Sequence, residues 1–347
     1  MSVTIALAGN PNCGKTTMFN ALTGANQYVG NWPGVTVEKK EGKLKNQKDV
    51  TVTDLPGIYS LSPYTLEEVV SRDYLLKEKP DVIIDLVDAT NIERNLYLAT
   101  QLLEIGIPVV IALNMVDLLK KNNIHINVKG LSSALGCPIV ETSALKGTGL
   151  KEVVDEAIKC ANQHRVPSKQ MEFPKAVEKA VNEIEGFVPA NIAEENKRWY
   201  AVKLLERDSK VKEGLNLPAS AQSRIEEIAS GLEKAEDDDT ESIVTDGRYQ
   251  YIQKVVSANV KRSGNKMTVS DKIDRIVTNR ILGLPIFILT MFIVYYVSVT
   301  TVGTMVTDWT NDSFVGTIQS VVSDGLGNAG VADWLVSLVS DGIIGGL

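Results

Sequence analysis

The sequence is poor in the residues that form disulfides and transition-metal sites. Its three cysteines, Cys13, Cys137 and Cys160, are widely spaced and form no CxxC pair. A sparse, odd-numbered set gives no disulfide framework and is typical of a reducing compartment. The two histidines, His125 and His164, do not lie at metal-ligand spacing from any cysteine. We therefore expect no zinc or iron site built from His and Cys side chains.

An excess of positive charge is also missing. The formal net charge is −7 at pH 7, and the N-terminal half shows no concentrated basic surface. Binding to nucleic acid depends on such a surface, because contacts to phosphates supply much of the affinity. We therefore expect no nucleic-acid partner.

The segment from Ile281 to Thr307 contains no charged residue. As a helix at about 1.5 Å per residue, this segment reaches roughly 40 Å, enough to cross a bilayer core of about 30 Å. A buried core helix is the alternative, but the length and the lack of charge favour a membrane span. Basic residues precede the segment and aspartates follow it, so the positive-inside rule places the N-terminal part in the cytoplasm. The flanking residues are Lys261, Arg262, Lys266, Lys272, Arg275 and Arg280 before it, and Asp308, Asp312, Asp324 and Asp333 after it.

Short apolar runs alternate with amphipathic segments over residues 1–165. This pattern predicts an α/β fold, in which helices cover a mostly parallel sheet. Strands buried on both faces read as continuous apolar runs. The predicted strands are Val3–Ala8, Val50–Thr53, Val82–Val87, Val109–Leu113 and Pro138–Val140.

The rest of the chain divides by composition. Over residues 166–265, apolar residues such as Val177, Val181 and Ile184 recur at helical spacing, which predicts an all-helical domain. We interpret its acidic run, Glu236–Asp239, as a solvated loop. The remaining predicted segments are a basic juxtamembrane linker over 266–280, a transmembrane helix over 281–307 and an amphipathic, interfacial segment over 308–347.

The first motif with chemical meaning is a phosphate-binding loop. Gly9–Thr16 reads Gly-Asn-Pro-Asn-Cys-Gly-Lys-Thr, which fits GxxxxGK[ST] between a predicted strand and a predicted helix. In such a loop the backbone amides surround the phosphates. Lys15 then supplies positive charge to the β- and γ-phosphates, and Thr16 offers a hydroxyl to Mg²⁺.

Two further segments have the spacing of nucleotide switches. Asp54-Leu-Pro-Gly57 follows a predicted strand, so Asp54 can hold Mg²⁺ through water and the Gly57 amide can sense the γ-phosphate. Thr36, in Gly34-Val-Thr-Val-Glu38, is the candidate for a second hydroxyl on Mg²⁺. We place it on a loop between the first helix and the next strand; a plain strand threonine is the alternative.

The motifs expected to recognise the base come last along the chain. Asn114-Met-Val-Asp117 ends a predicted strand, and Ser143-Ala-Leu145 follows another. The Asp117 carboxylate can accept hydrogen bonds from N1 and N2 of guanine, donors that adenine does not present. Since Met115 stands where the usual motif has Lys, we expect guanine preference with modest affinity and fast exchange.

The predicted nucleotide contacts come from all of these motifs. They are Gly9, Asn10, Pro11, Asn12, Cys13, Gly14, Lys15, Thr16, Thr17, Gly34, Val35, Thr36, Asp54, Gly57, Asn114, Met115, Asp117, Ser143, Ala144 and Leu145.

The ordered motifs, together with Val29-Gly-Asn-Trp-Pro-Gly-Val-Thr-Val-Glu38 and the membrane-entry stretch Asp274–Ile286, closely resemble the FeoB family of bacterial ferrous-iron transporters. The resemblance covers the whole chain. It implies a GTPase domain, a helical domain sometimes described as stabilising bound GDP, and a first membrane span in the bacterial cytoplasmic membrane. It further implies that ferrous iron passes through additional spans that are not part of this sequence. Small accessory transporter subunits and homo-oligomers are partners that the resemblance allows.

The resemblance also implies particular residue roles. Asn12 matches the asparagine that coordinates K⁺ in related cation-activated GTPases, where the cation does the work of an arginine finger; a turn-stabilising residue is the alternative. We expect Asn12, Lys15, Thr36 and Gly57 to act in catalysis. Ile58 stands where many small GTPases carry a catalytic glutamine and cannot orient water by a hydrogen bond, so we expect slow intrinsic hydrolysis.

Cys13 has two interpretations. A thiol among phosphate-binding amides could have a lowered pKa and be sensitive to oxidation. The favoured interpretation is a small residue that fits the loop.

Three other functions share parts of this pattern. A soluble GTPase of ribosome assembly or RNA modification would carry a basic RNA-binding domain and no hydrophobic span, and this sequence shows the opposite on both counts. A P-loop kinase or ATPase is disfavoured by Asn114 and Asp117. A membrane-tethered regulatory GTPase without a transport role stays open, because one membrane helix cannot enclose an ion pathway.

Overall fold

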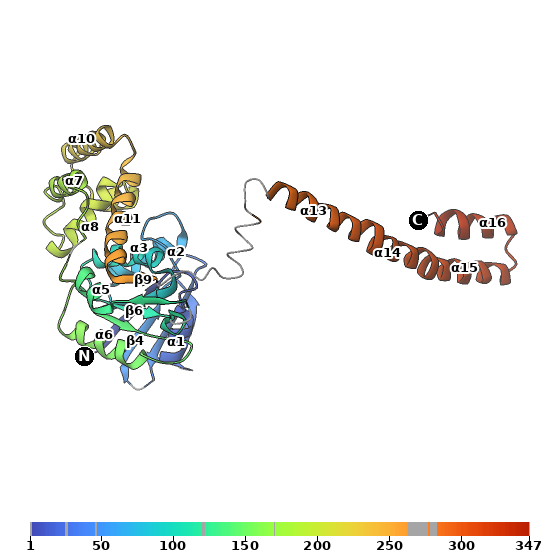
Figure 1. The fold of residues 1–347 in the computed structure, drawn as a ribbon, viewed down its shortest axis with the longest axis horizontal. Coiled ribbons are helices and arrows are strands. Elements are labelled where there is room, and N and C mark those ends of the chain that lie inside the picture. Colours follow the sequence, from blue (N-terminus) through green and yellow to red (C-terminus); the bar gives the residue numbers. More distant parts are fainter. Residues whose placement is uncertain are drawn as a thin grey trace. The chain divides into compact units, whose positions relative to one another are not determined.

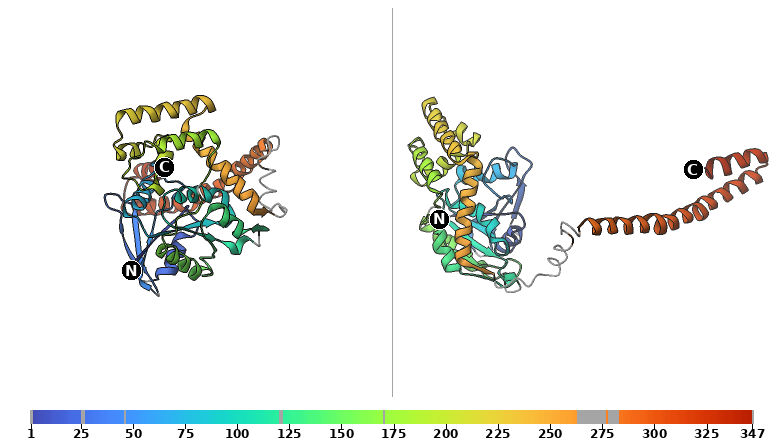
Figure 2. Two further views of the ribbon diagram at one scale, coloured as in Figure 1. Left: turned by 90° about the vertical axis from the view of Figure 1, so that its left-hand side faces the viewer. Right: turned by 45° about the horizontal axis from the view of Figure 1, so that its top comes forward.

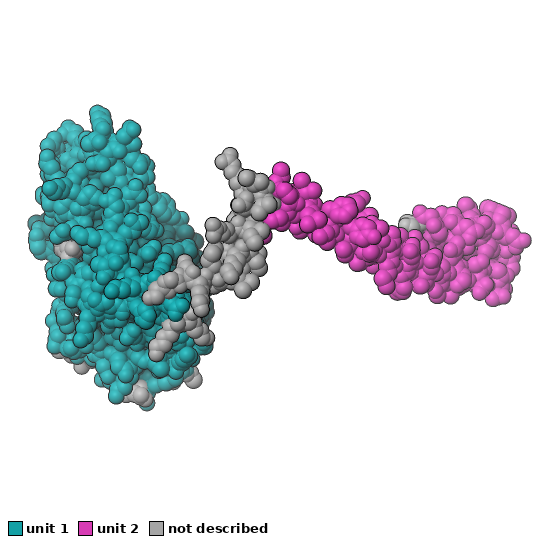
Figure 3. Space-filling model, viewed as in Figure 1, with its two compact units in different colours: residues 1–264 teal, residues 265–347 magenta. Residues whose placement is uncertain are grey.

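The computed structural model describes residues 2–24, 27–45, 47–119, 122–169, 171–262, 277 and 283–346. They belong to two compact units, Met1–Gly264 and Asn265–Leu347 (Figure 3). Each unit is described by itself.

The first unit contains a seven-stranded sheet with the strand order β2-β3-β4-β1-β5-β6-β8. From β4 to β8 all neighbouring strands are parallel, which confirms the predicted α/β fold. These strands are β1 (Val3–Gly9), β4 (Gln47–Asp54), β5 (Val82–Asp88), β6 (Val109–Asn114) and β8 (Ile139–Glu141).

Two antiparallel strands at one edge were not predicted. They are β2 (Gln27–Asn31) and β3 (Glu38–Leu44), which form a hairpin that continues the sheet beyond β4. The sequence of β3, Glu-Lys-Lys-Glu-Gly-Lys-Leu, has no apolar run because most of its side chains are at least partly exposed. Strand hydrogen bonds, which the composition does not reveal, stabilise this hairpin.

Two hydrophobic clusters cover opposite faces of the sheet, as the alternation of side chains along a strand requires. One cluster holds Ile5 and Leu7 of β1 with α1 (Lys15–Thr23) and α6 (Leu150–Asn162). The other holds Ala6 and Ala8 with the helices of the second face. These helices are α2 (Leu66–Asp73), α3 (Ile92–Leu103) and α5 (Val128–Leu135), while the short α4 (Val116–Leu119) follows β6.

The described part of the region predicted to be all-helical contains five helices. The second cluster continues into them through buried residues such as Val181, Trp199 and Ile252. In Figures 1 and 2, α11 runs from this region along the sheet, and it contacts α3 and α5. The helices are α7 (Lys175–Glu185), α8 (Glu194–Leu205), α9 (Ser209–Leu215), α10 (Ala219–Glu236) and α11 (Thr240–Asn259).

The acidic run forms the exposed turn between α10 and α11. Asp237 has a positive φ of 57°, and the Asp239 carboxylate accepts a hydrogen bond from the Ser242 amide (2.9 Å). Asp239 therefore caps α11. After α11, β9 (Val260–Arg262) pairs antiparallel with β7 (Ile124–Ile126).

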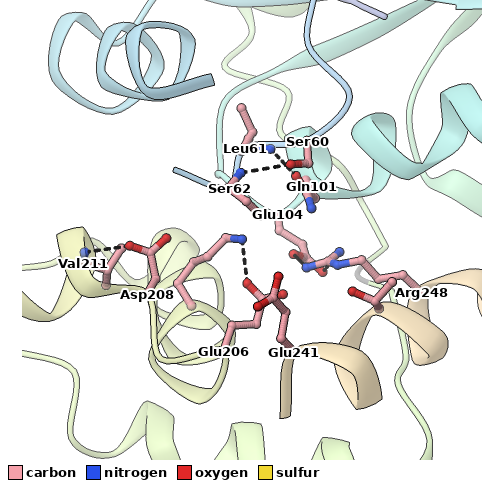
Figure 4. Close-up of polar contacts among 12 residues, drawn as sticks. Ser60, Leu61, Ser62, Gln101, Glu104, Glu206, Asp208, Val211, Glu241 and Arg248 are labelled. Atoms are coloured by element: carbon pink, nitrogen blue, oxygen red, sulfur yellow. Dashed lines mark hydrogen bonds and ion pairs between the residues drawn. The ribbon is translucent and has the colours of Figure 1, made fainter. Parts of the chain in front are cut away.

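Two buried ion pairs join the helical region to the sheet region among the described residues, and Figure 4 shows the one between Arg248 and Glu104. Arg248 of α11 donates two hydrogen bonds to the Glu104 carboxylate, at 3.0 and 2.7 Å, and both side chains are almost fully buried. Arg72 of α2 donates to Asp208 at 2.7 Å, and this pair is also buried. The predicted boundary near residue 165 thus separates two sequence regions that share one packed interior.

The second unit contains a continuous helix from Gly283 to Asn328 that is long and apolar enough to cross a membrane. None of its described side chains is buried within the unit. The helix continues past Thr307, the predicted end of the membrane span, as far as Asn328. Its segments are α13 (Gly283–Tyr295), a π-helical stretch (Tyr296–Gly303), α14 (Thr304–Asp308), a second π-helical stretch (Trp309–Val315) and α15 (Gly316–Asn328).

A short helix, α16 (Asp333–Ser337), continued by a π-helical stretch (Leu338–Ile344), packs against α15. The predicted basic linker, apart from Val277, lies outside the described residues. So do Ile281, Leu282 and most of the membrane-entry stretch Asp274–Ile286.

Candidate nucleotide-binding site

A pocket of about 700 Å³ opens at the carboxyl ends of β1, β6 and β8. This is the end of an open α/β sheet at which ligands usually bind. The loops that follow these three strands supply most of the lining. The lining residues are Asn10, Pro11, Asn12, Gly14, Lys15, Thr16, Thr17, Gly57, Asn114, Met115, Asp117, Leu118, Ser143, Ala144 and Leu145.

Asn114 connects the phosphate-binding loop to the loop that follows β8. Its amide group donates to the Cys13 carbonyl (2.8 Å), and its side-chain oxygen accepts from the Ala144 amide (2.9 Å). This contact requires a glycine at position 14, because a Cβ there would lie 2.4 Å from Asn114 Nδ2. The two predicted motifs are therefore held in a definite relation to each other by one buried side chain.

The loop Gly9–Thr16 joins β1 to α1, as predicted. Lys15 Nζ donates to Asp54 Oδ1 at 2.7 Å, which joins the last residue of β4 to the phosphate-binding loop at the same end of the sheet. Burial raises the pKa of the Asp54 carboxyl, and the charge of Lys15 opposes this rise. The Asp54 carboxylate and the Thr16 hydroxyl are oxygen ligands of the kind that Mg²⁺ prefers.

Two neighbouring side chains position the Asp117 carboxylate, the group predicted to contact the base. Ser143 Oγ donates to its Oδ1 at 2.9 Å, and Lys146 Nζ lies 3.3 Å from its Oδ2. The hydrogen bond from Ser143 and the nearby Lys146 lower the pKa of Asp117. An ionised carboxylate accepts hydrogen bonds only, so it complements the paired donors of guanine.

Apolar side chains flank Asp117. Met115 lines the pocket with a positive φ of 63°, and Leu145 lines it with 85% of its surface exposed. Leu118 also lines the pocket and was not among the predicted contacts. The signal that could have found it is an apolar residue next to Asp117 at the half-buried start of a helix.

The residues predicted to form the first nucleotide switch (switch I) lie outside the pocket lining. Gly34, Val35 and Thr36 do not line the pocket, and Thr36 is exposed. They lie in the turn of the β2–β3 hairpin, so Thr36 is on a loop before a strand, as predicted, but the unpredicted strand β2 comes between this loop and α1.

Burial limits the chemistry that two further residues, Cys13 and Ile58, can perform. Cys13 is 1% exposed, and burial raises the pKa of its thiol to about 12, so the reactive-thiolate interpretation is wrong and the small-residue one holds. Ile58 is 2% exposed and packs in the core, where it cannot orient a water molecule.

Comparisons with known proteins place these motifs in a family. Residues 3–157 match the family model described as "Ferrous iron transport protein B", and residues 173–261 match the "FeoB cytosolic helical domain". Among curated relatives, a Fe(2+) transport protein A/Fe(2+) transporter FeoB fusion protein of Porphyromonas gingivalis is 38% identical over 99% of this chain. The Fe(2+) transporter FeoB of Escherichia coli K12 is 36% identical over 99% of this chain. The chain spans only 42% and 44% of the lengths of these two relatives.

Solved structures from S. thermophilus are more similar. A GDP-bound mutant of the FeoB G-domain is 47% identical with a TM-score of 0.72, covering 75% of this chain and 100% of that one. NFeoB bound to GDP.AlF4- and K+ is 48% identical with a TM-score of 0.68, covering 74% of this chain and 99% of that one.

Proposed function

Since this chain belongs to the FeoB family of ferrous iron transport proteins, we propose that it is the cytoplasmic GTP-dependent switch of a ferrous-iron transporter. The chain carries the GTPase domain of that family, and its reaction is the hydrolysis of GTP to GDP and phosphate. The helix from Gly283 to Asn328 attaches this domain to the bacterial cytoplasmic membrane.

The proposal depends most on one observation, that Lys15, Asn114 and Asp117 line the same pocket. The phosphate-binding loop and the guanine motif thus share one cavity, and Asn114 of the guanine motif is hydrogen-bonded to Cys13 of the phosphate-binding loop and to Ala144 of the loop after β8. A nucleoside triphosphate can thus place its phosphates on the backbone amides that precede α1 and its base on Asp117.

The chain's own residues then act on the phosphates and the base. Backbone amides of Gly14–Thr16 and the ammonium of Lys15 orient and neutralise the β- and γ-phosphates, and Asp117 selects guanine. Bound Mg²⁺ would be held by Thr16 and Asp54, and by Thr36 after the switch I turn has moved, and it supplies further charge neutralisation. With Ile58 buried, the attacking water must be positioned by backbone groups such as the Gly57 amide.

K⁺ is the proposed activator. Asn12 lines the pocket with a positive φ of 66°, so its side-chain oxygen can serve as a ligand beside the phosphates. The S. thermophilus relative that was solved with GDP.AlF4- and K+ supports the same assignment. The cation would supply the positive charge that an arginine finger supplies elsewhere.

Single-turnover GTP hydrolysis in K⁺ and in Na⁺ tests this mechanism. We expect faster hydrolysis in K⁺, and we expect Asn12→Ala to remove the difference, because it removes the side-chain oxygen. Asn20→Ala, at an exposed position on α1, is the matched control and should keep the K⁺ effect. Equal rates in K⁺ and Na⁺ for the unaltered chain would contradict the K⁺ assignment.

The transport role belongs to the whole polypeptide that its longer relatives represent. Iron uptake by a full-length transporter carrying Lys15→Ala should fall sharply, since the substitution removes phosphate binding. Unchanged uptake would instead favour a membrane-tethered regulatory GTPase. The relative in which transport protein A is fused to FeoB supports a small accessory subunit as a partner.

A further inference from the structure

The switch I turn contains one buried side chain among exposed neighbours. Trp32 is 7% exposed, whereas Asn31, Pro33 and Thr36 are exposed. Trp32 belongs to the hydrophobic cluster that includes Leu55, Ile58 and Leu61, which lie within and just after the Asp54–Gly57 motif. The turn that carries Thr36 is therefore anchored in the same hydrophobic core as the segment that carries Gly57.

Two contacts hold the Trp32 ring. The ring of Tyr74 meets it edge-on, with centroids 5.3 Å apart and planes at 71°. Tyr74 is itself held by a hydrogen bond from its hydroxyl to Thr53 Oγ1 (3.1 Å). Lys39 Nζ lies 5.2 Å from the centroid of the Trp32 ring, in cation–π geometry. The ring thus lies between the end of α2 and strand β3.

The backbone of Trp32 determines where Thr36 lies. The Trp32 carbonyl accepts a hydrogen bond from the Val35 amide (3.2 Å), and Gly34 has a φ of 77°. With Pro33 in the second position, these features define a type II turn. The Trp32 amide donates to the Val37 carbonyl (2.9 Å) and closes the loop. While Trp32 is docked, Thr36 is consequently held in an exposed position outside the nucleotide pocket.

We propose that Trp32 is a latch that keeps Thr36 away from the nucleotide site, and that GTP with Mg²⁺ binds productively only when Trp32 leaves its place against Tyr74. This inference rests on the proposed GTP-dependent function. In it, Trp32 is the residue that positions Thr36 on the switch I turn. One feature of the docked state lowers its stability, so that Trp32 can leave its place. Trp32 Nε1 is buried without a hydrogen-bond partner among the described residues, which reduces the stabilisation that the buried ring provides.

The latch predicts different effects on the two nucleotides. GDP has no γ-phosphate, so its binding does not depend on Thr36. A GTP analogue with Mg²⁺ gains its contact with Thr36 only in the undocked state, so its apparent affinity is reduced by the fraction of molecules that are docked. Removing the latch should strengthen binding of the GTP analogue and leave GDP binding unchanged.

The first test measures dissociation constants of GMPPNP with Mg²⁺ and of GDP for the full chain. For Trp32→Ala we expect about threefold to tenfold tighter GMPPNP binding and less than about twofold change for GDP. Tyr28→Ala removes a side chain that is 69% exposed on the same hairpin and should change neither constant. Equal shifts for both nucleotides, or weaker binding of GMPPNP to Trp32→Ala, would overturn the latch.

The second test needs no destabilised variant. The chain has four tryptophans, so the emission of Trp32 is taken as the difference between the unaltered chain and Trp32→Phe. Addition of GMPPNP and Mg²⁺ should shift that emission to longer wavelength as the ring meets water, and GDP should not. GMPPNP binding without a shift would overturn the latch but leave the proposed function intact, whereas absence of GMPPNP binding by the unaltered chain would contradict the proposed function itself.

Discussion

At the scale of single residues, the site depends on side chains that combine burial with specific hydrogen bonds. Asn114 is 2% exposed, and Asp117 and Ser143 hold each other at 2.9 Å. Such groups are expensive to remove, because their partners stay buried without a hydrogen bond. Asp85 differs from them, because its buried carboxyl lies in the middle of β5, away from the pocket lining, and its Oδ2 has no hydrogen-bond partner among the described residues.

We expect Asn114→Ala to destabilise the chain by about 2–4 kcal/mol, since it leaves the Cys13 carbonyl and the Ala144 amide without their partner. Nucleotide affinity should fall at the same time, because the two loops of the pocket are no longer joined. Urea unfolding and calorimetric titration with GDP measure the two effects. Asn182→Ala, at an exposed position of α7, is the control and should change neither quantity.

Asp117→Asn should change the preferred base from guanine to xanthine. Xanthine carries a carbonyl in place of the guanine amino group, and the amide of Asn can donate to it while the carboxylate of Asp cannot. Competition of GTP against xanthosine triphosphate for the pocket measures the preference. Retained preference for GTP would show that Asp117 does not contact the base.

Asp85 should make the stability of the chain depend on pH. The side chain is 1% exposed, its Oδ2 has no partner among the described residues, and burial raises its pKa from 3.8 to about 7. Between these two values the unfolded chain is ionised and the folded chain binds the proton, so stability decreases as pH rises from about 4 to about 7. Asp85→Asn should remove most of this decrease in urea unfolding measured from pH 5 to 8; an unchanged pH profile would contradict the assignment.

At the scale of secondary-structure elements, the hairpin β2–β3 and helix α11 position the site without belonging to it. The hairpin carries Thr36 on its turn, and α11 binds the sheet region through the buried pair of Arg248 and Glu104. Arg248 also lies 5.3 Å from the ring of Phe173, measured from its guanidinium carbon to the ring centroid. A buried charge of this kind is tolerated only while its partner is present.

Glu104→Ala should therefore destabilise the chain by about 3–5 kcal/mol, because it leaves the Arg248 guanidinium buried and unpaired. The double variant Glu104→Leu with Arg248→Met should lose much less, since both charges are gone. Thermal and urea unfolding of the two variants give the comparison. Lys77→Ala breaks the exposed pair with Asp73 and should cost less than about 1 kcal/mol.

At the scale of the whole molecule, the chain consists of a unit with its own core and a unit whose described residues form none. Met1–Gly264 contains both hydrophobic clusters, whereas the described side chains from Gly283 to Asn328 are not buried by the protein. An apolar helix with exposed side chains needs an apolar environment, which a bilayer supplies. Folding and nucleotide binding should therefore be properties of the first unit, and membrane attachment a property of the second.

A chain that ends at Gly264 should be soluble and bind GDP with the affinity of the full chain, whereas the full chain should fractionate with membranes. Phe292→Asp in the full chain should reduce the membrane-bound fraction without changing GDP affinity, because a carboxylate in the middle of the span costs about 2–3 kcal/mol. Fractionation and nucleotide titration measure both. Loss of GDP binding in the shorter chain would show that the second unit is needed for the site.

The main residues of the pocket lining and the central part of the fold were predictable from the sequence. Lys15, Asn114 and Asp117 could be predicted to meet at one site because phosphate and guanine recognition need fixed residue types at fixed spacing. The parallel strands could be predicted because burial on both faces produces continuous apolar runs. The long apolar helix could be predicted from the absence of charge, although in the structure it continues beyond Thr307 to Asn328.

The tertiary structure alone decided features that depend on neighbours distant in sequence. The strands β2 and β3 have no apolar runs and become strands through pairing, β2 with β3 and β3 with β4. Leu118 reaches the pocket through the packing of α4. The pairing of Arg248 with Glu104 and the docking of Trp32 against Tyr74 leave no periodic signal either. The composition and spacing of a segment reflect which of its side chains are exposed to water. These contacts instead depend on which segments pack against each other in the folded chain.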